Sequence, residues 1–396
     1  MKYHVNYNNE IAPKYTIKEI FEDNWDAFLD DVAQQNRAIR RTILREVEKI
    51  IHCQDLKKGF ALYSCPKCHN IKLVPFTCKS RFCNCCGAKY AKDRALNMSA
   101  KLLDCSHRHV VFTIPEELRK YFSHDRSLLN VLFKAAEEAV TYYFNSRNKA
   151  EKYTPGMILV MHTFGRDLKW NPHIHMILCE EAIGNSRQWK KFDHIHYESF
   201  RRSWQYCLLK LLSEKIKDSS FKTLVNKLYS TYKSGFYVNA PPIKNFNSGV
   251  VHYILRYTGR PVIAQSRITN YDCKTVTFNY TPHGSNELII ETIPVFDFIK
   301  RLIIHIPDKN FKMIRYSGFY FNFNPKYKQY LLRAKKMPHL ISKQLKKIHA
   351  SWRSRIRYYF HYDVLKCTCG AYYELIELFC RPQKINFYLS YYHNSS

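Results

Sequence analysis

Seven of the chain's 14 cysteines fall within 34 residues, and this cluster constrains the fold more than any other feature of the sequence. They are Cys53, Cys65, Cys68, Cys78, Cys83, Cys85 and Cys86. Cys65 and Cys68 form one CxxC pair, and Cys83 and Cys86 form a second pair after an interval of 14 residues. Because each CxxC turn can present two thiolates to one ion, the two pairs predict a tetrahedral Zn²⁺ site. Four thiolates leave no position for water, so we expect this zinc to be structural.

The remaining cysteines leave part of the ligand choice open. Cys53 and Cys78 are surplus to the two pairs, so a swapped ligand or a second, poorer site remains an alternative. Near the C-terminus, Cys367 and Cys369 have Cys380 as a third thiol but no obvious fourth ligand, and we do not expect them to bind zinc. Tight CxxC clusters in a basic chain whose first residues lack an apolar signal segment indicate reduced thiolates and a cytoplasmic location.

The net charge points to the kind of partner. The chain carries 63 Lys and Arg residues against 33 Asp and Glu residues, which gives a formal net charge of +30. Such an imbalance favours a polyanion, either nucleic acid or an anionic membrane surface. A mean hydropathy of −0.42 and the lack of an apolar run near the ~20 residues of a membrane span argue against the membrane. We therefore expect a nucleic-acid partner, with some of the 5 Trp, 30 Tyr and 25 Phe residues available for base stacking.

Basic residues gather in two places. Lys79 and Arg81 flank the cysteine cluster, where a zinc-organised surface would suit DNA. From Leu331 to Lys366, ten Lys or Arg residues accompany a single acid, Asp363, and aromatic rings interleave with them. Candidate DNA-binding residues in this tract are Arg353, Arg355 and Arg357. A solvated helical face is the alternative interpretation of the tract.

Hydrophobic periodicity predicts an α+β fold. Helices are expected over 16–52 (as two helices), 88–103, 115–122, 125–147, 198–233, 249–257 and 295–305. Strands are expected over 107–115, 157–164 and 173–179, and as short alternating runs between 271 and 293.

A pair of histidines stands on one of the expected strands. His173 and His175 lie two residues apart, so their imidazoles project from the same face while Ile174 and Met176 face a core. Two nitrogens with open positions beside them suit a catalytic divalent metal. Two other such pairs occur in the chain, His107/His109 and His194/His196. A satisfied pair of surface histidines is the alternative.

A third metal ligand is expected from a neighbouring strand. If strands 157–164 and 173–179 form a hairpin with Phe164 opposite His173, then His162 lies opposite His175 on the same face. A register slip of one residue would turn His162 away. His109 is the second candidate.

Two tyrosines occupy successive turns of the helix expected at 249–257. Tyr253 and Tyr257 are four residues apart, which places both on one helix face. Arg256, Arg260 and Arg267 surround them with charge suited to phosphates. In a chain with 30 tyrosines such a pair also arises by chance.

Five stretches of sequence carry a family resemblance between Cys53 and about Phe321. They are SCPKC with TCKSRFCNCCG, HVVFTIPEELR, HTFGRDLKWNPHIHMIL, YILRYTGRPVIAQSRI and FIKRLIIHIPDKNFKMIRYSGFY. In them the chain resembles the two-tyrosine HUH transposases of rolling-circle insertion sequences, the insertion sequence ninety-one family. The extra Cys85 departs from the family's cysteine pattern, and the last 70 residues match only loosely.

The resemblance implies an HUH nuclease core, in which an antiparallel sheet presents the His173/His175 strand beneath a helix that bears tyrosine nucleophiles. Expected domains are an N-terminal helical segment 1–52, a zinc knuckle with its flanking helix 53–100, the nuclease core 101–293 and a basic, mostly helical C-terminal region 294–396. The implied reaction is cleavage of single-stranded DNA at transposon ends, supported by Mg²⁺ or Mn²⁺. Attack by Tyr253 or Tyr257 would form a 5′-phosphotyrosine and free a 3′-hydroxyl.

Other functions fit some of these observations. A replication initiator or a conjugative relaxase would use the same chemistry. A zinc-dependent DNA-binding regulator could keep the fold without the reaction. The chain has no GxxxxGK[ST] nucleotide loop, so we expect any helicase to come from the host.

Overall fold

The computed structural model describes residues 14–99, 102–103, 105–146, 150–192, 195–241, 261–282, 284–321 and 351–380. The chain forms two compact units. The first unit comprises Met1–Arg94, Gly259–Asp308 and Leu340–Ser396, and the second unit comprises Ala95–Thr258 and Lys309–His339. Both units are discontinuous in sequence, whereas the expected domains 1–52, 53–100, 101–293 and 294–396 were contiguous. The α+β class is confirmed by the mixture of helices and antiparallel sheets.

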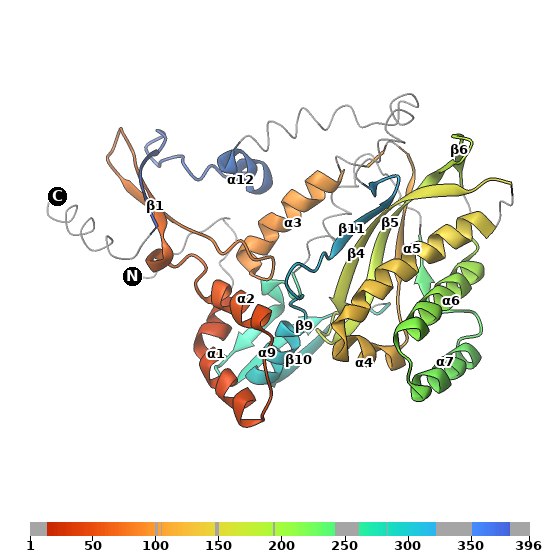
Figure 1. The fold of residues 1–396 in the computed structure, drawn as a ribbon. Coiled ribbons are helices and arrows are strands. Elements are labelled where there is room, and N and C mark those ends of the chain that lie inside the picture. Colours follow the sequence, from red (N-terminus) through yellow and green to blue (C-terminus); the bar gives the residue numbers. More distant parts are fainter. Residues whose placement is uncertain are drawn as a thin grey trace. The chain divides into compact units, whose positions relative to one another are not determined.

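The second unit is built on an antiparallel sheet with the strand order β11-β4-β5-β3-β7, and β6 pairs with β5 (Figure 1). Its strands are β3 (His107–Phe112), β4 (Tyr153–Phe164), β5 (Trp170–Gly184), β6 (Trp189–Lys191), β7 (Val238–Asn239) and β11 (Ile314–Gly318). The three strands expected at 107–115, 157–164 and 173–179 are confirmed. β4 and β5 extend beyond their expected ends and form a long hairpin.

Helices cover one face of this sheet. Ile174 and Met176 of β5 belong to a large core that also includes residues of α4 (Glu116–His124), α5 (Leu129–Ser146), α6 (Tyr197–Lys215) and α7 (Ser219–Thr231). On the opposite face, Ile177 and Cys179 join a smaller core with Phe319 and Tyr320. The alternation of side chains along β5 therefore separates the face that packs against these helices from the face that carries His173 and His175.

The segment expected to be largely helical over 198–233 is two helices. α6 ends at Lys215 and α7 begins at Ser219. The carboxylate of Asp218 accepts a hydrogen bond from Ser220 N at 3.2 Å and so caps the N-terminus of α7. Within the described parts of the chain, no helix combines the length and the apolar character needed to cross a bilayer.

Helices and a small sheet form one part of the first unit. The helices are α1 (Ile17–Gln34), α2 (Arg41–Ile51) and α9 (Val295–Ile303), and the sheet has the order β10-β9-β8, with β8 (Ile268–Tyr271), β9 (Thr275–Tyr280) and β10 (Ile289–Pro294). Asn24 of α1 donates to the Tyr271 hydroxyl at 2.6 Å, and this hydroxyl donates to Asp23 at 2.9 Å. These bonds tie α1 to the end of β8.

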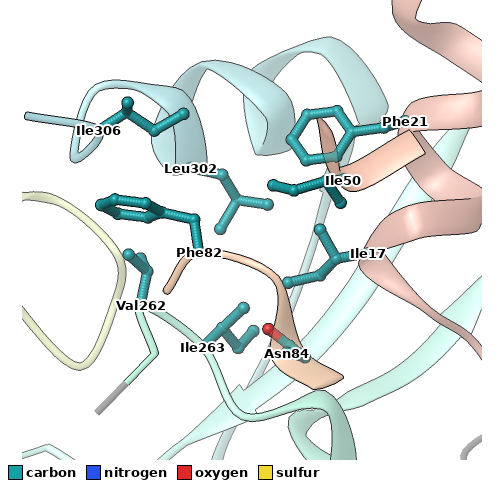
Figure 2. Close-up of a pocket in the computed structure, with 9 residues that line it drawn as sticks. All are labelled: Ile17, Phe21, Ile50, Phe82, Asn84, Val262, Ile263, Leu302 and Ile306. Carbon is teal, nitrogen blue, oxygen red and sulfur yellow. The ribbon is translucent and has the colours of Figure 1, made fainter. Parts of the chain in front are cut away.

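A small cavity lies among the apolar side chains of these elements (Figure 2). It is lined by Ile17, Phe21, Ile50, Phe82, Asn84, Val262, Ile263, Leu302 and Ile306. Its volume of about 20 Å³ holds roughly one water molecule. The cavity is therefore a gap in the core and too small for a ligand.

A second small sheet completes the first unit. Its order is β12-β1-β2, with β1 (Phe60–Ser64), β2 (Ile71–Pro75) and β12 (Glu374–Phe379). β1 pairs antiparallel with its neighbour β2 in the hairpin and with the distant β12, so that Phe60 lies opposite both Pro75 and Phe379. The helix α3 (Asn84–Ser99) follows the cysteine-rich segment, and α12 (Trp352–Phe360) precedes β12.

Candidate metal centres and DNA-binding residues

Three histidines of the second unit gather on one face of its sheet. His162 on β4 and His173 and His175 on β5 offer ring nitrogens that all lie within 4.8 Å of one another. Nε2 of His173 and Nε2 of His175 are 3.0 Å apart. Two nitrogens bound at right angles to one ion, each at roughly 2.1 Å, are separated by about this distance. The three imidazoles therefore fit one divalent cation.

The register of the β4–β5 hairpin differs from the expected one. His162 pairs with His173, and Val160 pairs with His175, so the expected pairing of His162 with His175 is wrong by two residues. The hairpin is tighter than expected because Phe164 still pairs with Trp170, beyond a register shift after His162. A two-residue change preserves the face of every side chain, so His162 still lies on the histidine face.

Hydrogen bonds hold the other ring nitrogens of this pair. His173 Nδ1 donates to the Asn171 carbonyl at 2.7 Å, and His175 Nδ1 lies 2.9 Å from His109 Nε2. His109, the second candidate for the third ligand, therefore stands behind His175 as an orienting partner. Such partners fix the ring and its tautomer so that the remaining nitrogen can bind metal.

Burial favours the neutral form of His109 and His173. It lowers the pKa of His109 to about 4, and repulsion by His173 adds to this effect. Burial also lowers the pKa of His173, and the charge of Arg119 acts in the same direction, although the bond to the Asn171 carbonyl opposes them. A neutral imidazole retains the lone pair that a metal ion requires.

The two other histidine pairs have different surroundings. His107 Nε2 lies 2.6 Å from the Tyr320 hydroxyl, and His107 forms a buried group with Cys105 and Cys179. His196 Nδ1 accepts a hydrogen bond from Ser199 N at the start of α6, which makes His196 a helix cap. Its neighbour His194 lies outside the described residues.

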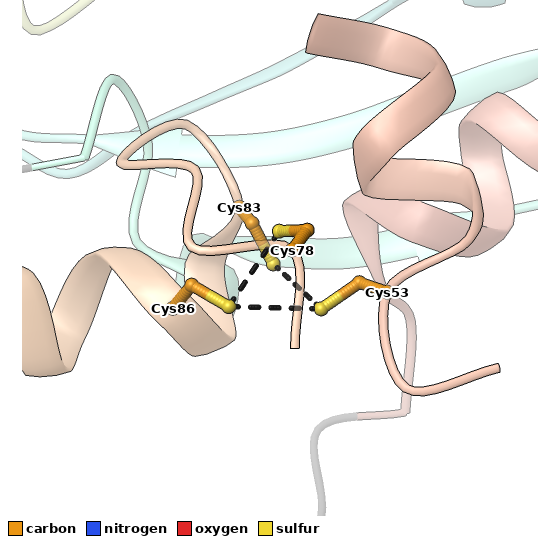
Figure 3. A group of neighbouring side chains, drawn as sticks. All are labelled: Cys53, Cys78, Cys83 and Cys86. Atoms are coloured by element: carbon orange, nitrogen blue, oxygen red, sulfur yellow. Dashed lines mark hydrogen bonds between the residues drawn. The ribbon is translucent and has the colours of Figure 1, made fainter. Parts of the chain in front are cut away.

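Four cysteines converge where α2, the segment after β2 and α3 meet (Figure 3). They are Cys53, Cys78, Cys83 and Cys86. The Sγ–Sγ distances are 3.7 Å for Cys53–Cys86, 3.5 Å for Cys78–Cys86 and 3.6 Å for Cys83–Cys53. A zinc ion with Zn–S bonds of ~2.3 Å has sulfurs about 3.8 Å apart, so this cluster fits a structural zinc. The neighbouring thiols, Cys53 first, lower the pKa of Cys86 and favour its thiolate.

The other expected pair of zinc ligands lies in a different cluster. Cys65 and Cys68 gather with Cys367 and Cys369, within 4.8 Å of one another. The expected zinc site of Cys65, Cys68, Cys83 and Cys86 is therefore wrong as a single ligand set. The reason is that the β1–β2 hairpin separates its own turn, with Cys65 and Cys68, from the start of α3.

Spacing alone leaves Cys53 and Cys78 surplus to the two CxxC pairs, and it offers no fourth ligand for the C-terminal cysteines. The sequence did carry a signal that Cys53 and Cys78 are ligands, because they are extra cysteines near a CxxC pair. No local signal could show that Cys367 and Cys369 meet Cys65 and Cys68, because 299–304 residues separate the paired sulfurs.

The candidate DNA-binding residues of the C-terminal tract differ in their surroundings. Arg353 donates two hydrogen bonds to the Asp363 carboxylate, at 2.8 and 2.7 Å, and these bonds lower the pKa of Asp363. Arg355 lies 3.9 Å from Asp93 of α3. The Arg357 side chain is 61% exposed and lies 3.8 Å from Asp363. Arg357 is thus better placed than Arg353 to meet a phosphate.

The other candidate DNA-binding residues lie in different surroundings. Lys79 is exposed, with a positive φ of 56°. Arg81 is half-buried, and desolvation lowers the pKa of its guanidinium. Arg267 donates to the Asn279 carbonyl at 2.6 Å. The nucleophile candidates Tyr253 and Tyr257, the adjacent Arg256 and Arg260, and the helix expected at 249–257 lie outside the described residues.

Two family models and two curated relatives match this chain. Residues 20–114 match the family model described as a transposase zinc-binding domain, of the insertion sequence ninety-one type, and residues 156–328 match the model described as a putative transposase. The chain is 28% identical over 335 residues to the transposase for insertion sequence element IS801 of Pseudomonas savastanoi pv. phaseolicola, covering 79% of this chain and 78% of the relative. It is 24% identical over 327 residues to the putative transposase y4qJ of Sinorhizobium fredii, covering 76% and 79%. No solved structure matches the chain.

The fold, the cysteine clusters and these similarities define a transposase with a zinc-binding domain. Within this class, the chain belongs to the insertion sequence ninety-one family. A transposase acts on DNA, which agrees with the net charge of +30.

The first cysteine cluster generates a prediction that separates it from the expected ligand set. Replacing Cys78 with Ser should remove one zinc equivalent per chain, because a hydroxyl is a poor substitute for a thiolate ligand. Cys85→Ser is the matched control, since Cys85 is exposed and outside the cluster. Elemental analysis of protein purified without chelator gives the measurement. Undiminished zinc in the Cys78→Ser protein would contradict the assignment.

Proposed function

We propose that this transposase cleaves and rejoins single-stranded DNA at transposon ends through 5′-phosphotyrosine intermediates. Tyr253 and Tyr257 are the proposed nucleophiles, and His162, His173 and His175 are the proposed ligands of the catalytic metal. The observation that supports this function most directly is the convergence of three histidine nitrogens on one face of an antiparallel sheet. The second unit is then an HUH nuclease core.

The ligand chemistry bears on the choice of metal. Mg²⁺ prefers oxygen ligands, whereas imidazole nitrogens suit first-row transition metals. A site with three imidazoles therefore favours Mn²⁺ over Mg²⁺ as the more effective ion. When bound, the cation polarises the scissile phosphate and balances the charge that develops on its oxygens.

The chain's own groups account for the remaining steps. The phenol of one tyrosine loses its proton, and its oxygen forms a bond to the phosphorus of the scissile phosphate. The bond from phosphorus to the 3′ oxygen breaks, and this oxygen takes up a proton to leave as a 3′-hydroxyl. Attack by a 3′-hydroxyl on the phosphotyrosine reverses the exchange, so rejoining needs no ATP. The second tyrosine allows a second transfer before the first intermediate is resolved.

Contacts in the second unit hold Ala240, the residue that directly follows β7. The Ala240 carbonyl accepts hydrogen bonds from Arg108 at 2.7 Å and from the Tyr197 hydroxyl at 3.0 Å. Arg108 is itself held by Glu180, at 2.8 Å from Nε and 2.7 Å from Nη2. Because Arg108 lies on β3, between β5 and β7 in the sheet, these bonds hold Ala240 beside the strand next to β5, which carries His173 and His175.

The partners follow from this reaction. The substrates are single-stranded DNA and transposon-end DNA, and strand separation would come from a host helicase or replication machinery. We propose a cytoplasmic, DNA-associated protein of a bacterial-type cell. A replication initiator or relaxase would use the same site on another DNA, and a non-catalytic regulator would bind DNA without cleaving it.

The histidine site generates the first test of this function. Replacing His173 and His175 with Ala should lower the cleavage rate of single-stranded DNA with Mn²⁺ by roughly 10³-fold, because transition-state charge loses its stabilisation. DNA affinity should change little, since phosphate contacts supply most of it. His124→Ala, at an exposed position of α4, is the control. Undiminished cleavage by the double variant would refute the metal site.

The tyrosines generate a second test. Tyr253→Phe with Tyr257→Phe should abolish the covalent protein–DNA adduct, because only the attacking oxygens are lost. Each single variant should retain one cleavage but fail in complete strand transfer. Tyr142→Phe serves as the control because its side chain is exposed on α5. Mass spectrometry of the trapped adduct identifies the attachment site, and a nucleotide on any other tyrosine would rule out the pair.

The arginines of α12 generate a third test. Arg357→Ala should weaken binding to all DNA sequences and lower the salt slope by about 1, because one phosphate contact is lost. Arg353→Ala should instead lower the melting temperature, since it removes the bidentate partner of the Asp363 carboxylate, whose side chain is only 11% exposed. Binding titrations at several salt concentrations and thermal melts separate the two. Identical effects of both changes would contradict these assignments.

A further inference from the structure

We infer that the chain binds a second structural zinc through Cys65, Cys68, Cys367 and Cys369. This ion would hold the C-terminal segment 351–380 against the β1–β2 hairpin. This site draws two of its ligands from beyond residues 20–114, the stretch that matches a zinc-binding domain. The inference rests on the cysteine geometry alone and is independent of the proposed reaction.

The four sulfurs have the spacing of a single tetrahedral site. Cys65 Sγ lies 3.5 Å from Cys369 Sγ, and Cys68 Sγ lies 3.5 Å from Cys367 Sγ. All four sulfurs lie within 4.8 Å of one another, so the two close contacts are edges of one cluster. Zinc with bonds of ~2.3 Å requires edges of about 3.8 Å, which small side-chain adjustments provide.

Each pair of cysteines lies in a tight turn, the first between β1 and β2 and the second between the bridged residues Lys366 and Tyr372. In the first turn, His69 N donates to the Cys65 carbonyl at 2.9 Å, and His69 has a φ of 58°. In the second turn, Gly370 N donates to the Cys367 carbonyl at 3.0 Å, and Gly370 has a φ of 88°. Two knuckles of similar form thus face each other across the cluster, the arrangement that a zinc ribbon uses.

The sheet below the cluster has a very small core of its own. Among the described residues, the buried members of this core are Phe60, Leu62 and Phe379. The outer strand β12 exposes Leu375, Ile376 and Leu378 by 51–55%. So small a hydrophobic core gives a three-stranded sheet little support, and small modules of this kind normally depend on metal or disulfides.

The zinc also positions the basic helix α12. Between α12 and β12, the Val364 carbonyl accepts a hydrogen bond from Lys72 of β2 at 2.6 Å. On α12 itself, the Tyr359 carbonyl accepts from Lys92 of α3 at 2.6 Å. Other contacts of this segment with β2 and α3 are also polar or cation–π contacts, such as Lys92 over the Phe360 ring and Arg355 beside Asp93. The metal would therefore be the main fastening of the segment that carries Arg353, Arg355 and Arg357.

Elemental analysis of the full chain tests the site. Protein purified without chelator should contain two zinc ions per chain, and Cys367→Ser with Cys369→Ser should contain one. Cys380→Ser is the matched control, because Cys380 follows β12 directly, is exposed and lies outside both clusters. The double variant should also lose its C-terminal segment to trypsin about tenfold faster, because local opening is no longer opposed by metal binding.

A second measurement needs no substitution and so does not depend on the variant folding. In the unaltered protein, the exposed Cys380 should react with iodoacetamide at once, whereas Cys68 and Cys369 should react only after a zinc chelator is added. Mass spectrometry locates the alkylated residues. A single zinc per chain, iron in place of zinc, two zinc ions retained by the double variant, or disulfides among these four cysteines would each overturn the inference.

Discussion

The antiparallel pairing of β4 with β5 is the interaction on which the histidine site depends. This pairing sets His162 opposite His173 and, through the alternation of side chains, turns Ile174 and Met176 into the helix-covered core. Burying a side chain of this size contributes about 1.5–3 kcal/mol, and several such side chains lie along each strand. A one-residue slip would lose all of that burial at once. The hydrophobic core therefore fixes the position of the three histidines proposed as metal ligands, although it contains none of them.

The first unit depends on a different kind of constraint. Its β1–β12 pairing joins segments about 300 residues apart, and the length-dependent cost of closing such a loop is about 5 kcal/mol. The three side chains that form this sheet's hydrophobic core offset little more than that cost. Zinc binding by four thiolates is worth about 10–16 kcal/mol in small peptides, which is enough to decide the balance. Metal binding and the folding of the C-terminal segment are then one equilibrium.

What could be predicted from the sequence was set by local patterns. Alternation along β5 correctly indicated that His173 and His175 share a face. The pattern of 157–164 likewise correctly predicted the preceding strand, β4. The register was off by two residues because turn geometry, not hydrophobic pattern, decides where the hairpin closes. Spacing could not assign the cysteines to their two clusters, because a CxxC turn can share a metal ion with any thiolates that the rest of the fold brings close to it. For Cys65 and Cys68 those thiolates come from the other end of the chain.

The same distinction between local and long-range information applies to the positive charge. The formal charge of +30 counts every arginine equally, but the fold commits several of them to the protein itself. Arg353 is held by Asp363, and Arg267 donates to the Asn279 carbonyl. An arginine already paired with a carboxylate displaces few counterions when DNA binds, so it contributes little to the salt-dependent part of affinity. The strength of DNA binding is therefore governed by the arginines and lysines that the fold leaves exposed, such as Arg357, rather than by the total charge.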